Sequence, residues 1–117
     1  MSDDAAADES VEGGSHLESA GVTDEQVLDA LFATIEDRKE RLPEDSYTAS
    51  LFTHEKGENA VLEKIGEEAT ETILAAKDDD TEELTAEAAD LVYHLLVLFA
   101  RKDLDVSDLQ AELRDRF

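Results

Sequence analysis

The sequence LVYHLLVLFA, at residues 91–100, is the stretch that decides the fold class. On a helix that turns about 100° per residue, it is apolar on nearly every side instead of along one stripe. Such a helix belongs at the centre of a bundle, where its neighbours cover it. Because the run is far too short to span a bilayer, it predicts a buried core helix and no membrane association.

The segments around this run repeat apolar residues at helical spacing. We predict helices from Thr23 to about Arg41, from Ser46 to between His54 and Gly57, from about Glu58 to Lys77, from Asp80 or Thr81 to about Lys102, and from Val106 to Arg114. Capping patterns support three of the starts: Thr23 with Gln26, Ser46, and Asp80 with Glu83. The fold prediction is therefore all-α, a four- to five-helix bundle in one domain.

Acidic residues dominate the composition. The chain has 32 Asp and Glu against ten Lys and Arg, a formal net charge of -22. This surface repels nucleic acid and anionic membranes, so neither is expected as a partner. The excess is typical of proteins from halophiles, where bound salt screens the self-repulsion, and it predicts that folding requires high salt.

The chain has no cysteine, which excludes disulfides and thiolate metal sites and leaves magnesium, manganese or calcium as candidate ions. Residues 1–21 hold six acids and no base, with almost nothing large and apolar. We expect a disordered acidic tail there, followed by a single domain at residues 22–117. The N-terminus lacks the basic and apolar regions of a signal peptide, so a cytoplasmic location is expected.

A seam of polar residues runs along the otherwise apolar helix, within about 60° of one another on the wheel. It consists of Glu83, Glu87, Asp90 and His94. Burying such charges costs several kcal/mol unless they are paired. The preceding helix carries Glu68 and Glu71 at the same three-residue separation as Glu87 and Asp90. Two such pairs on consecutive antiparallel helices can converge on one or two divalent ions.

A purely structural interpretation stays open at this point. The preceding helix has an apolar face formed by Leu62, Ile65, Ala69, Ile73 and Ala76. Its acids Glu67, Glu68 and Glu71 lie opposite that face, where ordinary solvated acids belong. His94 either hydrogen bonds to Asp90 or packs in the core, and it is a poor magnesium ligand because magnesium prefers oxygen.

Three segments closely resemble the phosphoribosyl-ATP pyrophosphatase family of histidine biosynthesis. They are SYTASLF at residues 46–52, GEEATETILAAK at 66–77 and EAADLVYHLLVL at 87–98, and the likeness extends over residues 27–114. In the wider all-α NTP pyrophosphatase superfamily, Glu-Glu-x-x-Glu followed by Glu-x-x-Asp marks the magnesium site. The resemblance therefore implies Mg²⁺ held by Glu68, Glu71, Glu87 and Asp90.

The activity that the resemblance implies is hydrolysis of phosphoribosyl-ATP to phosphoribosyl-AMP and pyrophosphate. Glu67 is then the candidate for orienting or deprotonating the attacking water, with a plain surface acid as its alternative role. Lys56, Lys64 and Lys77 are candidates for contacts with phosphate or ribose oxygens, although Lys77 could instead complement the end of its helix. Related chains are usually homodimers, which implies that a second copy completes the bundle.

Three other functions compete with this one. A housecleaning pyrophosphatase of the same fold would act on noncanonical or surplus dNTPs through the same carboxylates. A non-enzymatic helical module would turn its acidic seam toward a basic partner. A calcium-binding protein ranks last, because the ligand loop of an EF-hand is missing.

Overall fold

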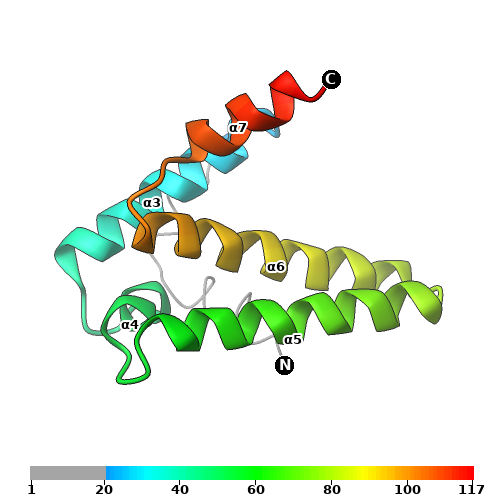
Figure 1. Ribbon diagram of the computed structural model, residues 1–117, viewed down its shortest axis with the longest axis horizontal. Helices are drawn as coiled ribbons and strands as arrows, with labels where there is room; N and C mark the ends of the chain where they lie inside the picture. Colours follow the sequence, from blue (N-terminus) through cyan, green and yellow to red (C-terminus); the bar gives the residue numbers. More distant parts are fainter. Residues whose placement is uncertain (1–20) are drawn as a thin grey trace.

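The computed structural model describes residues 21–117, and every regular element in this range is an α-helix (Figure 1). The helices are α3 (Val27–Arg41), α4 (Tyr47–Thr53), α5 (Glu58–Lys77), α6 (Thr81–Arg101) and α7 (Val106–Asp115). The all-α prediction is confirmed, and the last four helices have close to the predicted bounds. The predicted acidic tail, apart from Gly21, lies outside the described residues.

The first helix begins later than its capping pattern predicts. The Gln26 amide donates to the Thr23 carbonyl at 3.0 Å, and the Thr23 amide donates to Gln26 Oε1 at 3.2 Å. These bonds close a turn, and the helix itself begins at Val27 with no side-chain cap. The caps at Ser46 and Asp80 are confirmed, since each side chain accepts a hydrogen bond from the amide three residues later.

The two longest helices, α5 and α6, form an antiparallel pair along the molecule (Figure 1). The turn between them is short because backbone bonds close it at once: the Asp79 amide donates to Ala76 at 3.1 Å and the Asp80 amide to Ala75 at 3.0 Å. Asp79 accordingly adopts a left-handed conformation with φ 57°. The tight turn keeps the two helices in contact, so residues on their facing sides meet.

The core forms where α6 meets α3, α4 and the start of α5. Its buried apolar residues are Phe32, Ile35, Leu51, Val61, Tyr93, Leu96, Val97, Ala100 and Val106. Four of these nine come from the run at 91–100, as its all-round apolar character predicts, and fully burying a side chain of this size contributes about 1.5–3 kcal/mol. Within residues 21–117, each helix is too short or too polar to cross a membrane.

Much of the predicted apolar face of α5 points away from the core of this chain, although Ile65 packs against it. Ile73 is 62% exposed and Leu62 is 42% exposed, whereas Glu68, on the acidic face, is only 2% exposed. The interpretation of the α5 acids as solvated surface charges is therefore wrong for Glu68. Contact with α6 decides this orientation, because the side of α5 that meets α6 is the side that carries acids.

Candidate active site

Carboxylates from both long helices are buried where α5 and α6 meet. Glu68 is 2%, Glu87 is 3% and Asp90 is 4% exposed, and Glu71 is half-buried. The predicted pairs, Glu68 with Glu71 and Glu87 with Asp90, thus lie on the facing sides of the two helices. Carboxylates are seldom buried without a compensating partner, so this interface is a candidate functional site.

His94 fixes the position of Glu68. Its Nδ1 atom lies 2.8 Å from Glu68 Oε1 and 3.1 Å from the backbone oxygen of Asp90. A carbonyl oxygen only accepts hydrogen bonds, so we assign the proton to Nδ1, which donates to both oxygens. In the neutral ring Nε2 then accepts from the Tyr47 hydroxyl at 3.1 Å. His94 is fully buried, and it bonds to the backbone of Asp90 instead of its carboxylate.

Two buried carboxylate oxygens have no hydrogen-bond partner among residues 21–117. They are Glu68 Oε2 and Glu87 Oε1, and both belong to the predicted metal-binding set. For Glu68 the arrangement is directional, because His94 occupies Oε1 and leaves Oε2 unpaired. Leaving a buried polar oxygen unsatisfied costs about 1–3 kcal/mol, and more when the group is charged. A positively charged partner at these oxygens would offset this cost.

Burial and the neighbouring acids together raise the pKa of Glu87. This pKa rises from 4.5 to about 8, mainly because the carboxyl is buried, and also because the side chains of Glu83 and Glu71 hydrogen bond to it and repel its charge. Glu71 of α5 and Glu87 of α6 are thus close enough to share a proton across the interface. Without a cation, the Glu87 carboxyl is mainly protonated at neutral pH.

The donor set fits a hard divalent cation. Within residues 21–117 no three carboxylate or imidazole groups already surround a single point closely enough to hold an ion. The chemistry is nevertheless appropriate, because Glu68, Glu71, Glu87 and Asp90 offer only oxygen donors, two of those oxygens are unpaired, and the acids repel one another. These four residues would hold Mg²⁺ or Mn²⁺, and the ion would relieve the repulsion.

The raised pKa of Glu87 predicts how pH acts on the metal-free protein. The folded state keeps a proton on Glu87 between pH of about 4.5 and about 8, whereas the unfolded chain does not. This contribution to stability is complete below pH 4.5 and is lost as pH rises through 8. We expect the metal-free melting temperature to fall across this range, and added Mg²⁺ to release close to one proton at pH 7. Calorimetry in two buffers of different ionisation enthalpy would count the proton; no release would contradict metal binding at Glu87.

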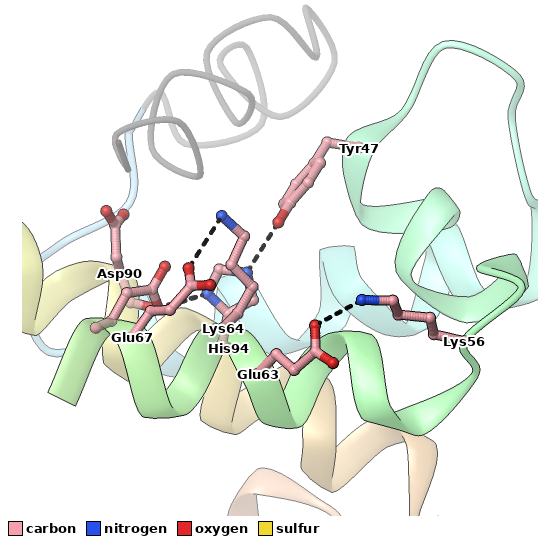
Figure 2. Close-up of polar contacts among 8 residues, drawn as sticks. Tyr47, Lys56, Glu63, Lys64, Glu67, Asp90 and His94 are labelled. Atoms are coloured by element: carbon pink, nitrogen blue, oxygen red, sulfur yellow. Dashed lines mark hydrogen bonds and ion pairs between the residues drawn. The ribbon is translucent and has the colours of Figure 1, made fainter. Parts of the chain in front are cut away.

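A pocket of about 180 Å³ opens next to the carboxylates, between α4 and the first half of α5 (Figure 2). It is lined by Tyr47, Ser50, Leu51, His54, Lys56, Ala60, Glu63, Lys64 and Glu67. Two of the three predicted substrate-binding lysines therefore lie in one place, together with the predicted water-activating acid Glu67. Tyr47 joins this pocket to the buried site, because its hydroxyl bonds to His94.

Two predicted site residues lie away from the buried carboxylates. The Glu67 side chain is 64% exposed and its Oε1 lies 3.9 Å from Lys64 Nζ, so it belongs to the pocket rim (Figure 2). Lys77 lies in the last turn of α5, roughly 20 Å along the helix from Lys64. The structure does not bring Lys77 to the pocket, and at this position it complements the helix C-terminus.

Sequence reasoning did not assign a role to Tyr47, Ser50 or His54. All three belong to or follow the segment SYTASLF, which carried part of the family resemblance. Their position in or next to a segment that resembles the family was the sequence feature that could have indicated a role in the site. Only the approach of α4 to α5 shows that they line the same pocket as Lys56 and Lys64.

Residues 28–117 match the family model for phosphoribosyl-ATP pyrophosphohydrolase. The chain belongs to this family. Curated relatives named phosphoribosyl-ATP pyrophosphatase include a Haloarcula marismortui protein, 76% identical over 90 residues that cover 77% of this chain and 92% of the relative. A Halobacterium salinarum relative is 66% identical over 90 residues, covering 76% and 95%. One from Methanococcoides burtonii is 47% identical over 93 residues, covering 80% and 94%.

Membership of the phosphoribosyl-ATP pyrophosphohydrolase family confirms the resemblance seen in the three quoted segments. The matched region contains the whole buried carboxylate interface and the pocket between α4 and α5. Several of the most similar relatives come from halophilic archaea, in agreement with the interpretation of the net charge of -22 as a halophilic surface.

Proposed function

We propose that this protein hydrolyses phosphoribosyl-ATP between its α and β phosphates, giving phosphoribosyl-AMP and pyrophosphate in histidine biosynthesis. The observation that carries the proposal is the buried carboxylate interface, in which Glu68 and Glu87, at 2% and 3% exposure, each have one oxygen with no hydrogen-bond partner within residues 21–117. A bundle that served only for packing would gain stability from apolar residues at these positions. Family membership supports the choice of substrate.

Each carboxylate has a role in this proposal. Glu68, Glu71, Glu87 and Asp90 would hold Mg²⁺, which when bound would neutralise phosphate charge and polarise the attacking water. His94 orients Glu68 by donating to Oε1 at 2.8 Å. The packing of α5 on α6 keeps the acids on the facing sides of the two helices before substrate arrives.

Glu67 is our candidate for orienting or deprotonating the water. It directly precedes Glu68 in the chain and lines the pocket, so the same turn of α5 carries a buried carboxylate and an acid at the space where substrate can enter. A general base has to reach both water and substrate, and an exposed carboxylate at the rim meets that requirement. Its ion pair with Lys64, at 3.9 Å, is loose enough to leave the carboxylate available.

The test is pyrophosphate release from phosphoribosyl-ATP in molar KCl, with Mg²⁺ or with EDTA, beside a panel of dNTPs. We expect release from phosphoribosyl-ATP in Mg²⁺ and none in EDTA. Preferential turnover of dNTPs would assign the protein to housecleaning instead. A folded protein that releases no pyrophosphate from any nucleotide would favour the acidic interaction module.

We further propose that two copies of the chain pair through the outer face of α5. Leu62 and Ile73 are eleven residues, about three turns, apart on this face and are 42% and 62% exposed. Val92 of α6 is also 39% exposed. An apolar stripe at helical spacing on a highly charged surface is typical of a helix–helix interface.

Replacing Ile73 by Asp is expected to convert the protein from dimer to monomer. A charge placed in an apolar interface loses its hydration without gaining a partner, which outweighs the contribution of one buried side chain. Light scattering coupled to gel filtration in molar KCl would measure the mass. Leu113→Asp in α7, which is 50% exposed and lies off the α5 face, should leave the mass unchanged. A wild-type protein with the mass of a single chain would contradict the proposal.

A further inference from the structure

The pocket between α4 and α5 brings together two basic side chains in a chain that has few of them. Only ten residues are Lys or Arg, yet Lys56 and Lys64 both line this space of about 180 Å³, together with His54. Figure 2 shows Lys56, from the turn before α5, reaching Glu63, and Lys64, from α5 itself, reaching Glu67. An acidic protein that places two bases at one pocket presents that pocket to an anion.

Neutral hydrogen-bonding groups complete the lining. His54 Nδ1 accepts the Lys56 amide at 3.0 Å, so in the neutral ring the proton lies on Nε2, which can donate to a ligand. Ser50 donates to the Tyr47 carbonyl at 2.5 Å, which leaves its oxygen as an acceptor for a hydroxyl. Two ammonium groups, one imidazole donor and one hydroxyl acceptor match a phosphate attached to a sugar.

Two acidic side chains form ion pairs with these lysines. Glu63 Oε1 lies 3.0 Å from Lys56 Nζ, and Glu67 Oε1 lies 3.9 Å from Lys64 Nζ. Both side chains of the Lys56–Glu63 pair are 55% exposed, and exposed pairs of this kind contribute only about 0–1 kcal/mol. A phosphate dianion can therefore replace these carboxylates as the partner of the lysines.

The position and size of the pocket indicate which phosphate it takes. Phosphoribosyl-ATP carries a triphosphate at one end and a single 5′-phosphate, on its second ribose, at the other. The buried carboxylates suit a metal-bound triphosphate, whereas lysines suit a phosphate that has no metal. The pocket is smaller than the roughly 300–1,000 Å³ of sites that enclose a whole ligand of drug size, so it holds one end of the substrate.

We propose that this pocket, through Lys56 and Lys64 with His54 and Ser50, binds the 5′-phosphate of the second ribose and so selects phosphoribosyl-ATP over nucleotides that lack it. The inference rests on the proposed function and names the part of the chain that gives it specificity. Lys64 precedes Glu68 by four residues, about 6 Å along α5, so one helix carries both a lysine of the pocket and a carboxylate of the buried site.

The experiment compares phosphoribosyl-ATP with ribosyl-ATP, the same nucleotide without the 5′-phosphate, in molar KCl and Mg²⁺. We expect Lys56→Gln and Lys64→Gln each to lower the ratio of kcat/KM for phosphoribosyl-ATP to kcat/KM for ribosyl-ATP by about 10-fold or more, the effect of removing one charge-assisted hydrogen bond. Equal losses on both substrates would leave the ratio unchanged and would place the lysines at the triphosphate, which would overturn the proposal. No loss on either substrate would overturn it as well.

Two further variants separate ligand binding from structure. Lys102→Gln removes an exposed lysine that pairs with Glu58 at 3.1 Å and should not change the ratio. Glu63→Gln removes the acid beside Lys56 and should raise the ratio. If Lys56 acted only through its pair with Glu63, the Glu63 and Lys56 variants would instead lower the ratio alike, which would overturn the proposal.

Failure of the proposed function is recognised separately, since a wild-type protein that hydrolyses neither substrate would refute it. In that case calorimetric titration with phosphoribosyl-AMP and ribosyl-AMP measures whether the pocket binds the 5′-phosphate, without any need for turnover. The proposal then requires tighter binding of phosphoribosyl-AMP by the wild type and loss of that preference in Lys56→Gln. Equal affinity for the two nucleotides, or binding of neither, would overturn it.

Discussion

Replacing Glu87 by Gln is expected to lower hydrolysis of phosphoribosyl-ATP by roughly 100- to 1,000-fold, while the metal-free protein becomes more stable above pH 8. The loss follows because an amide cannot supply the negative charge that holds the cation, and metal-derived stabilisation of several kcal/mol is removed. The gain follows because Gln keeps nearly the same volume and hydrogen-bonding capacity as the protonated acid but never ionises.

The size of the stability change depends on pH. Below a pH of about 4.5 the Glu87 carboxyl is neutral in both the folded and the unfolded wild-type chain, and the two proteins should melt at similar temperatures. Between pH values of about 4.5 and about 8 only the unfolded wild-type chain loses this proton, so the Gln variant becomes increasingly more stable than the wild type. Above a pH of about 8 the difference is complete, because the folded wild-type chain must then ionise a carboxyl that is 3% exposed and lies against Glu71 and Glu83. Added Mg²⁺ should reverse the order, because only the wild type retains the full ligand set.

The measurements are kcat/KM by pyrophosphate release and melting by circular dichroism in EDTA at pH 4 and pH 9. Glu40→Gln is the matched control, since it removes one charge from an exposed position on α3. It should preserve activity, and it shows how much of any stability gain comes from lower net charge alone. Full activity in Glu87→Gln would mean that Glu87 is not a metal ligand.

The melting temperature is expected to rise by about 10 °C or more between low and molar KCl, the shift produced by about 2 kcal/mol in a domain of this size. Six of the 32 acids precede Gly21, so the described residues hold 26 acids against ten bases. Repulsion among exposed charges favours expansion, and added salt shortens its range to a few ångströms.

The same KCl series near pH 4 provides the control for this interpretation. Protonation of carboxylates removes most of the repulsion there, so the dependence on salt should become small. Unfolding would be followed by circular dichroism in EDTA, so that a bound divalent ion does not contribute. A melting temperature at neutral pH that is flat across the KCl series would show that the acidic surface does not limit stability.

Local sequence was sufficient for most of the helices, because their ends are set by nearby residues. The side chains of Ser46 and Asp80 cap helices where the pattern places them, and the run at 91–100 occupies the core. At Thr23 the pattern misled, since the same residues that can form a capping box also close a turn ahead of the helix. Propensity alone does not separate these two outcomes.

The pocket between α4 and α5 could be predicted only in part. Lys56 and Lys64 stood out as bases close in sequence to the acids, and both line the pocket. Lys77 met the same criterion, yet it lies at the far end of α5. Proximity in sequence does not fix direction along a helix, because each residue adds about 1.5 Å of rise. Ser50 and His54 join the pocket through the packing of α4, which no local pattern specifies.

Sequence alone was enough to predict that the chain is helical, where most of its helices lie, which family it belongs to, and that consecutive helices carry two pairs of carboxylates three residues apart. The face of α5 that is buried could be learned only from the packed structure. That helix has an apolar face and an acidic face, and periodicity alone favours burying the apolar one. Packing on α6 buries Glu68 and leaves Ile73 exposed, because burial is a property of the surface that a helix meets as well as of its own side chains.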